Sequence, residues 1–435
     1  MYQIFHDRFA RGDLSNLPKG LAYHRKMGRQ VVDHERWNEM PLYQPLPGQK
    51  DYSPCDFFGG DLKGIENALP YFKELGVSIL YLNPIVEADS NHRYNTADYK
   101  KVDPILGTNE DFVRLCRKAK KEGIRIVLDG VYSHTGSDSV YFNKNGNYET
   151  LGAYQGKESP YYKWYDFQNG NRDVYKSWWG FQTLPEVNEM EPTWQDFVIT
   201  GKESVFAHWL SLGASGYRLD VADELPDEVI ALMRQATKRD DKSNLLLGEV
   251  WEDATTKESY GVKRQYALGA GLDSVMNYPF KEACLNFLLG RGTAEDLKYF
   301  LLGQETNYPK PMYYCLMNLL SSHDIPRMRT VLGTGLDGST MTREQQATYA
   351  IGEGQEQEGA SLAKLATALQ FAVPGMPSIY YGDEYGMQGF KDPLNRGTFC
   401  QRDPEMYEIT KKYAQLRKKE DCLRTGHAVV FAPHP

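Results

Sequence analysis

A short stretch in the middle of the chain, GYRLDVADEL from residue 216 to 225, places an arginine and an aspartate where they can act together. Apolar side chains alternate with Arg218 and Asp220, which is the period of a strand, so the two charged side chains point the same way. A guanidinium keeps a neighbouring carboxylate ionised, and an ionised, oriented carboxylate can act as a nucleophile. Taken alone, the stretch favours a structural ion pair. Other residues of the chain favour a catalytic role for Arg218 and Asp220.

Further polar residues stand at or just after the ends of other apolar segments: Asp129, His134, Glu249, His323 and Asp324. The carboxyl ends of the strands of a parallel barrel meet at one rim, where barrel enzymes keep their active sites. We therefore expect these side chains to converge with Arg218 and Asp220.

The carboxylates, with no phosphate-binding loop, indicate glycoside hydrolysis. A mechanism that retains anomeric configuration needs a nucleophilic carboxylate and a protonated carboxyl group about 5 Å apart. Asp220 beside Arg218 suits the nucleophile. Glu249, between Gly248 and Val250, suits the proton donor because an apolar or anionic setting raises a carboxyl pKa. Asp129 is expected to support the rim.

The elements that must position these residues alternate along the chain. Amphipathic helices are predicted at residues 61 to 76, 108 to 123, 202 to 212 and 226 to 238. Apolar strands are predicted at residues 1 to 9, 77 to 87, 123 to 134, 215 to 221, 244 to 251, 272 to 280, 313 to 320 and 377 to 382. Eight strands separated by helices predict an α/β fold, a (β/α)8 TIM barrel.

The predicted barrel is interrupted once. Residues 1 to 134 and 188 to 424 form the barrel, and residues 135 to 187, rich in Tyr, Trp, Asn and Gly, form an irregular subdomain inserted after the third strand. Residues 425 to 435 are expected to begin a C-terminal β-domain. Because both ends look cut, we expect a catalytic part of a longer protein and predict no cellular location.

The bulk composition limits the kinds of partner that the protein can be expected to bind. The 435 residues are 41% hydrophobic and 25% charged with a net charge of −8, which argues against nucleic acid or an anionic membrane as a partner. No apolar run is long enough to cross a membrane. The six cysteines are scattered without a CxxC pair, so neither a zinc site nor a disulfide scaffold is indicated.

The motifs resemble those of the alpha-amylase family of glycoside hydrolases. The main matching blocks are DGVYSH (129 to 134), GYRLDVADE (216 to 224), GEVW (248 to 251) and SSHD (321 to 324). Secondary matches are HRYNTADY (92 to 99), LPEVN (184 to 188), GGDLKGI (59 to 65) and GMPSIYYGDEYGM (375 to 387). The resemblance implies that Asp220 forms a covalent glycosyl intermediate and that Glu249 acts as acid and then base. It implies that Asp324 stabilises the transition state and that Arg218 orients Asp220.

The resemblance also implies a set of substrate-binding residues. His134 and His323 would hydrogen-bond the sugar at the cleavage site, and Tyr94 would stack on its ring, with His92 and Asp98 nearby. His92 equally fits a loop histidine, and Trp178 and Trp179 fit packing of the inserted subdomain as well as sugar platforms.

YQIFHDRF, LPEVN and the ADE after the nucleophile resemble the neopullulanase, cyclomaltodextrinase and maltogenic amylase branch, or a related amylopullulanase. In that branch Glu224 would lie on the leaving-group side. Asp392 and Arg396 of DPLNR would bind the next sugar on the non-reducing side.

Calcium is the point at which the sequence departs from the family. Ser133 replaces the asparagine that commonly binds one ion, so that site is expected to be absent. A second site in the first loop would use Asp13, Asn16, Gly59 and Asp61, but Arg11 and Leu17 replace oxygen ligands, and calcium takes six to eight oxygens. Either calcium or the Arg11 guanidinium would supply positive charge there.

Three functions follow from these patterns. The first is a retaining, endo-acting hydrolase of α-1,4 bonds in starch, pullulan or cyclodextrins, and the sequence leaves open whether it also cleaves α-1,6 bonds. The second is a 4-α-glucanotransferase on the same fold, in which a sugar hydroxyl replaces water as the acceptor. The third, a non-catalytic glucan-binding or transport-accessory protein, is disfavoured because Asp220, Glu249 and Asp324 are all present.

Overall fold

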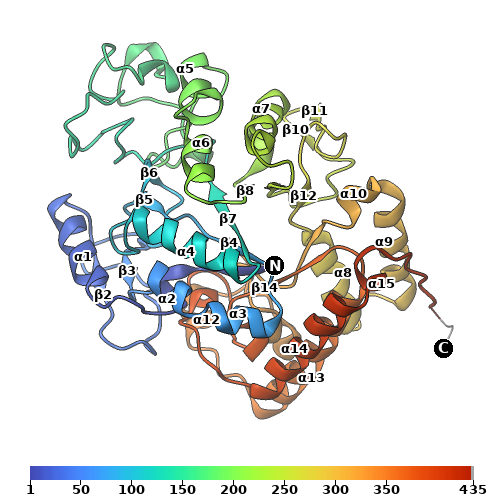
Figure 1. Ribbon diagram of the computed structural model, residues 1–435. Helices are drawn as coiled ribbons and strands as arrows, with labels where there is room; N and C mark the ends of the chain where they lie inside the picture. The colour runs from blue at the N-terminus through green and yellow to red at the C-terminus, as the bar shows by residue number, and fades with distance from the viewer. Residues whose placement is uncertain (433–435) are drawn as a thin grey trace.

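The computed structural model describes residues 1 to 432 and is built around one eight-stranded parallel sheet (Figure 1). Its strands are β1 (Tyr2–Ile4), β4 (Ile79–Leu82), β7 (Arg125–Gly130), β8 (Gly216–Leu219), β9 (Leu245–Gly248), β12 (Ser274–Val275), β13 (Met317–Leu319) and β14 (Met376–Tyr380). They are ordered β12-β9-β8-β7-β4-β1-β14-β13, and a parallel bridge from Met276 to Met317 joins the two end strands. The predicted TIM barrel is confirmed.

Strand alternation separates the inside of the barrel from the side that faces the helices. Tyr81 and Leu247 belong to a cluster that also contains Met317 and Leu319, whereas Leu80 and Leu246 pack in the main core with the outer helices. Because the period is two, the last residues of each strand place alternate side chains over the barrel mouth.

Helices surround this sheet (Figure 1). They are α1 (Asn16–Lys26), α2 (Leu62–Asn67), α3 (Leu69–Leu75), α4 (Asn109–Lys121), α5 (Pro192–Gln195), α6 (Val205–Ser211), α7 (Asp227–Lys238), α8 (Tyr278–Leu288), α9 (Ala294–Asn307), α10 (Lys310–Tyr313), α11 (Met328–Thr334), α12 (Arg343–Ala347), α13 (Glu353–Ala372), α14 (Pro404–Lys419) and α15 (Cys422–Thr425). Helix α4 shows why they form: Thr108 and Asp111 make a capping box, and Phe112 and Leu115 lie on its buried face. Within residues 1 to 432, no helix has the length and apolar character of a membrane span.

Most predicted strands are shorter in the structure, and the segment predicted as one strand at 77 to 87 contains both β4 and β5 (Val86–Ala88). Three further segments also differ from the prediction. The helix predicted over residues 61 to 76 is two helices, α2 and α3, because Pro70 has no N–H to donate and its ring would crowd the preceding turn. The strand predicted at 272 to 280 is only two residues long, since Asn277 accepts the N–H of Phe280 and starts α8. The strand predicted at 1 to 9 ends at Ile4.

The remaining small elements lie in loops. They are β2 (Val32–Asp33), β3 (Asp56–Phe57), β5 (Val86–Ala88), β6 (Thr96–Val102), β10 (Glu258–Ser259), β11 (Val262–Lys263), the 3-10 turns η1 (His6–Arg8), η2 (Tyr162–Trp164), η3 (Gln168–Gly170), η4 (Trp178–Gly180), η6 (Ala222–Glu224), η7 (Asp383–Tyr385) and η8 (Leu394–Arg396), and the π-turn η5 (Asp196–Thr200). Residues 135 to 187, between β7 and β8, contain only turns and isolated bridges and project from one side of the barrel (Figure 1).

The inserted segment packs through its aromatic residues. The ring of Phe142 lies 4.8 Å from the rings of both Tyr165 and Tyr175. At the other end of the chain, residues 426 to 432 form no regular element, and residues 433 to 435 lie outside those described. The domain boundaries and the C-terminal β-domain therefore stay predictions.

Candidate active site

The polar residues singled out in the sequence meet at the carboxyl end of the barrel. Asp129 on β7 pairs in register with Arg218 on β8, and Arg218 pairs with Leu247 on β9. Asp220 and Glu249 follow Arg218 and Leu247 by two residues, so they point into the same mouth one layer higher. Strand register therefore stacks a guanidinium and three carboxylates above the barrel core.

Arg218 is the centre of this cluster. Its Nη1 lies 2.7 Å from Asp129 Oδ1 and 2.8 Å from Asp220 Oδ1, and its Nη2 lies 2.8 Å from Glu249 Oε2. The side chain of Arg218 is fully buried, so the guanidinium is held by the carboxylates and not by water. One cation is shared by three acidic groups.

Sharing changes the charge state expected for Asp220. The sequence predicted that Arg218 would keep this carboxylate ionised. Burial raises the pKa of Asp220 well above its ordinary value, Glu249, Asp129 and Asp324 raise it further, and Arg218 opposes them. Burial and the charge of Glu249 also raise the pKa of Asp324 to about 7. The cluster therefore retains a proton close to neutral pH, and that proton belongs to the interacting group as a whole.

Glu249 accepts several hydrogen bonds, and the carboxyl groups that an anionic setting implied lie nearby. Its Oε2 accepts the backbone N–H of Val221 at 2.8 Å, and its Oε1 accepts the indole N–H of Trp251 at 3.1 Å. Trp251 is fixed by stacking on Tyr278 with 3.9 Å between ring centroids. Val221 has a φ of 36°, which is strained for a β-branched residue, and this turn aims its N–H at Glu249.

Tyr94 links the cluster to the opposite wall of the site. Its hydroxyl donates to Asp129 Oδ2 at 2.7 Å and accepts from Asn83 Nδ2 at 2.7 Å. His323 Nε2 lies 2.6 Å from the same hydroxyl, and Gln3 Nε2 lies 2.9 Å from His323 Nδ1. Because the Gln3 amide donates to Nδ1, the ring proton of His323 is on Nε2 and points at the hydroxyl of Tyr94.

The other two histidines lie beside Tyr94. The Nε2 of His134 lies 3.1 Å from the backbone oxygen of Tyr94, and burial lowers the pKa of His134 to about 4. The Nδ1 of His92 accepts the backbone N–H of Tyr94 at 3.1 Å, and burial lowers its pKa well below the ordinary value. Burial also lowers the pKa of His323 well below its ordinary value. All three imidazoles are therefore neutral and offer hydrogen bonds without adding charge.

Asp98 stands apart from this group. It lies on β6, where its Oδ1 accepts the backbone N–H of Lys100 at 3.0 Å. Within the described residues no hydrogen bond joins it to His92 or Tyr94. Its predicted role beside the sugar stays a prediction.

Asp324, which follows β13, and Asp392 and Arg396, which follow β14, form another side of the site. Arg396 Nη1 lies 2.7 Å from Asp392 Oδ1, and Nη2 lies 3.8 Å from Asp324 Oδ1. Arg396 Nε also donates to the backbone oxygen of His323 at 3.0 Å. Arg396 thus ties the two predicted sugar-binding carboxylates to one wall.

Several residues of the site were missed by the sequence analysis. Tyr81 donates to Asp129 Oδ2 at 2.6 Å, and Asn83 and Gln3 hold Tyr94 and His323 as described above. A polar residue inside an apolar strand, such as Gln3 in YQIF, was the available signal.

The predicted residue Glu224 lies after β8, where it accepts hydrogen bonds from Trp179 and Tyr260.

The first-loop residues predicted to bind calcium also meet in space. Asp61 Oδ1 accepts the backbone N–H groups of Gly12 and Gly64 at 3.0 and 2.7 Å, and Oδ2 accepts those of Asp13 and the Asn16 amide at 2.9 and 2.8 Å. Both carboxylate oxygens are thus used by N–H donors.

Arg11 occupies the neighbouring acceptors. It donates to the backbone oxygens of Phe58 and His34 at 2.6 and 3.0 Å, and Leu17 packs against Gly59. This donor set does not fit a cation that takes six to eight oxygens. Calcium at this position stays a prediction.

We expect Asp324→Asn to raise the melting temperature at about pH 8, because an ionised Asp324 is unfavourable in the folded site. Its folded pKa of about 7 is above the ordinary value of 3.8, so its ionisation lowers stability as the pH rises between these values. The gain should shrink toward about pH 4, where both proteins are neutral at this position. Thermal melts across this range measure it, with Asp240→Asn at an exposed site as the control. A lower melting temperature for Asp324→Asn at about pH 8 would contradict the charge assignment.

Eight parallel strands with acidic side chains gathered at their carboxyl ends define the class of the protein: a barrel whose rim carries the groups that glycoside hydrolysis needs. A family model described as alpha amylase, catalytic domain, matches residues 3–426. The chain belongs to the alpha-amylase family of glycoside hydrolases, as the motifs predicted.

Individual relatives indicate which branch of the alpha-amylase family the chain resembles. The chain is 36% identical to an amylopullulanase of Thermoanaerobacter thermohydrosulfuricus, over 98% of this chain and 30% of that protein. It is 32% identical to a cyclomaltodextrinase of Geobacillus thermopakistaniensis, over 99% of this chain and 64% of that protein. The structure of the type III pullulan hydrolase from Thermococcus kodakarensis matches with a TM-score of 0.78 at 28% identity, over 98% of this chain and 70% of that one. The chain thus spans less than two thirds of the length of the two curated relatives.

Proposed function

We propose that the protein is a retaining, endo-acting hydrolase of α-1,4 bonds in starch, pullulan or cyclodextrin-type glucans, with α-1,6 bonds as the second candidate that the test below distinguishes. The observation that carries the proposal is the position of Asp220 and Glu249 on the two nitrogens of one guanidinium. These contacts hold both carboxyl groups at the same place in the barrel mouth, where they can act on one glycosidic bond. The retaining mechanism is proposed because the motifs around Asp220 and Glu249 match those of the alpha-amylase family.

In this proposal Asp220 attacks the anomeric carbon while Glu249 protonates the departing glycosidic oxygen. Glu249 then removes a proton from the water that hydrolyses the glycosyl ester, so the configuration is retained. Arg218 holds Asp220 in place. Asp324 and the neutral His134 and His323 bind hydroxyls of the sugar at the point of cleavage.

The substrate proposal rests on the relatives and on residues to both sides of the carboxylates. Asp392 and Arg396 stand after β14, and Glu224 stands after β8, four positions away around the barrel. A glucan chain therefore finds polar groups on opposite sides of the cleavage point, as an endo-acting enzyme requires. The relatives include an amylopullulanase and a cyclomaltodextrinase. Nucleic acid and membranes are not proposed as partners.

The test is incubation with soluble starch, pullulan and β-cyclodextrin, followed by chromatography of the products. Panose from pullulan indicates α-1,4 cleavage, and maltotriose indicates α-1,6 cleavage. Proton NMR of the first product formed should show the α-anomer, as a retaining mechanism requires. Absence of product from all three glucans, or a β-anomer as the first product, would overturn the proposal.

A further inference from the structure

Val221, the residue directly after Asp220, has a backbone conformation that valine disfavours. Its φ of 36° and ψ of 60° lie in the left-handed region, where a side chain branched at Cβ is strained. This turn aims the N–H of Val221 at Glu249 Oε2, 2.8 Å away, and the N–H of Ala222 donates to the backbone oxygen of Glu249 at 3.2 Å. Strain of this kind persists only where surrounding contacts over-determine the backbone. Contacts elsewhere in the turn must therefore hold it.

Asp223, in the same turn, is held through its carboxylate and its backbone oxygen. The hydroxyl of Tyr266 donates to Oδ1 at 2.7 Å, and Lys257 Nζ lies 2.9 Å from Oδ2. The backbone oxygen accepts from Arg264 Nη1 at 2.8 Å and from Ser259 Oγ at 3.2 Å. All four donors belong to the loop that follows β9. One loop thus fixes this turn at every oxygen of Asp223.

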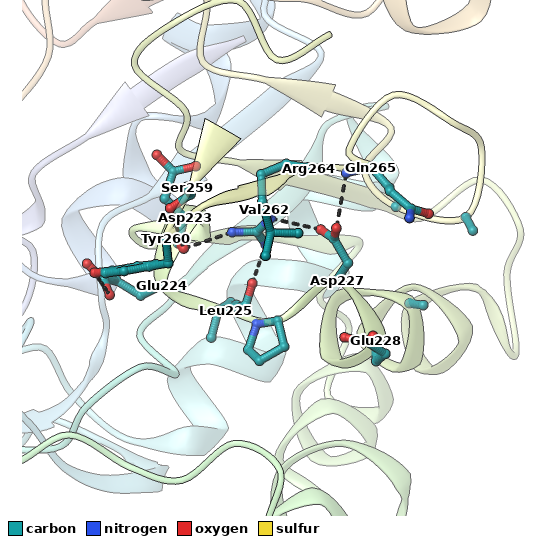
Figure 2. Close-up of a pocket in the computed structure, with 14 residues that line it drawn as sticks. Asp223, Glu224, Leu225, Asp227, Glu228, Ser259, Tyr260, Val262, Arg264 and Gln265 are labelled. Carbon is teal, nitrogen blue, oxygen red and sulfur yellow. Dashed lines mark hydrogen bonds and ion pairs between the residues drawn. The ribbon is translucent and has the colours of Figure 1, made fainter. Parts of the chain in front are cut away.

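The side chain of Arg264 spans the turn. Besides Asp223, it contacts Asp227 at the start of α7, with 3.0 Å between Nε and Oδ1, and its Nη2 donates to the backbone oxygen of Leu225 (Figure 2). The guanidinium lies 4.6 Å from the centre of the Tyr266 ring, and the side chain is only 5% exposed. One buried side chain therefore binds the turn at several consecutive points.

These polar contacts cross an open space. The turn and the start of α7 line one side of a pocket of about 520 Å³, and the loop after β9 lines the other side. The loop contains the β10–β11 hairpin, at whose base the backbone N–H of Arg264 donates to the oxygen of Lys257 at 2.9 Å. The donors thus stand on a paired base, and hydrogen bonds and ion pairs hold the turn across the pocket.

We propose that the loop after β9 carries a latch that positions Glu249. The latch consists of Lys257, Arg264 and Tyr266. It holds the turn, the turn keeps Val221 in its strained conformation, and the Val221 N–H keeps the Glu249 carboxyl directed at the glycosidic oxygen. The three latch residues act through the turn, so they are positioning residues. The inference rests on the proposed hydrolase activity, in which Glu249 is the acid–base residue.

Loss of the latch should matter most where proton donation matters most. Without the latch contacts, Val221 can relax to a negative φ, which turns its N–H away and leaves Glu249 less well aimed. A general acid contributes most for a leaving group that departs poorly without a proton. The 4-methoxyphenoxide ion is such a group, whereas 4-nitrophenoxide is stable enough to leave with little assistance. The two groups are similar in size, so changes in binding should affect both aryl α-maltosides alike.

The test compares kcat/KM for 4-methoxyphenyl α-maltoside with kcat/KM for 4-nitrophenyl α-maltoside. In Arg264→Leu the value for the methoxyphenyl substrate should fall about tenfold relative to that for the nitrophenyl substrate. Tyr266→Phe removes one hydroxyl and keeps the buried ring, so it should show a change of about threefold in the same direction even if Arg264→Leu does not fold. Arg114→Leu is the matched control, since Arg114 pairs with Glu66 and Asp111 on outer helices, and it should leave the ratio unchanged.

A second measurement does not depend on turnover. Hydrogen–deuterium exchange of residues 220 to 225, followed by mass spectrometry of peptides, should be about tenfold faster in Arg264→Leu, because the Val221 N–H loses its fixed acceptor. Exchange of this segment should be unchanged in Arg114→Leu. If the parent protein cleaves neither maltoside, the activity proposal fails, and the exchange rate alone decides whether the latch holds the turn.

Two results would overturn the latch. An equal loss of kcat/KM for both maltosides would show that Arg264 and Tyr266 only stabilise the fold. Unchanged exchange of residues 220 to 225 in both Arg264→Leu and Tyr266→Phe would show that the turn keeps its conformation without them.

Discussion

Glu249→Gln is expected to lower kcat for maltohexaose by about 10³- to 10⁴-fold, because the glycosidic oxygen then departs without a proton. The same variant should still react with α-maltosyl fluoride, since fluoride leaves without protonation. Glutamine cannot activate the water that would release the enzyme, so a maltosyl adduct should accumulate on Asp220. Mass spectrometry of the intact protein and of its peptides measures the adduct and its position.

Matched variants make this result specific. Asp220→Asn should form no adduct with the fluoride, because the amide is too weak a nucleophile. The control is Glu252→Gln. Glu252 follows Glu249 by three residues but is exposed and pairs with Lys257, so this variant should keep normal turnover. Near-normal maltohexaose hydrolysis by Glu249→Gln, or an adduct on a residue other than Asp220, would refute the assigned roles.

The fold was largely predictable because its signals are local. Alternation between short apolar segments and amphipathic segments predicted eight strands and a parallel barrel, and the capping box at Thr108 set the start of α4. The lengths of the strands and helices were less predictable than their order. The segment at 272 to 280 is apolar enough for a strand, but the cap of Asn277 starts a helix inside it, and apolar character does not distinguish the two.

The candidate site was predictable as a list of residues but not as a network. Residues at strand ends identified Asp220, Glu249 and Asp324, since a parallel barrel brings such ends together. That Arg218 contacts three carboxylates depends on strand register across β7, β8 and β9, which no single segment encodes. Gln3 lies far from its partner His323 in the sequence, and Asn83, the partner of Tyr94, lies outside the quoted motifs. Both contacts are therefore visible only in the folded barrel.

Backbone conformation was the least predictable feature. Trp179-Gly180 and Tyr260-Gly261 do not resemble the Asn-Gly pair that marks a left-handed turn, so neither turn was expected at its position. In both turns the aromatic side chain contacts Glu224, a tertiary contact that the local sequence does not encode. The strained Val221 is a similar case next to the nucleophile, where Glu249 accepts its N–H.

The shared guanidinium leads to the largest expected effect on stability. Arg218→Leu is expected to lower the free energy of unfolding by about 3–5 kcal/mol at neutral pH, because Asp129, Asp220 and Glu249 then lose their buried cation. Urea denaturation followed by tryptophan fluorescence measures this difference. Arg239→Leu, which removes an exposed pair with Asp240, is the control and should change stability by less than about 1 kcal/mol.

The pH dependence distinguishes lost charge pairing from lost packing. Without the guanidinium, the pKa of Asp220, which burial already raises, should rise further above its value in the unfolded chain. A carboxyl group with a raised folded pKa destabilises the folded state as the pH rises through that pKa. The stability gap between Arg218→Leu and the parent should therefore widen from about pH 5 to about pH 8. A gap that stays constant over this range would mean that Arg218 stabilises the barrel by filling space, and the description of the site as three carboxylates on one cation would be wrong.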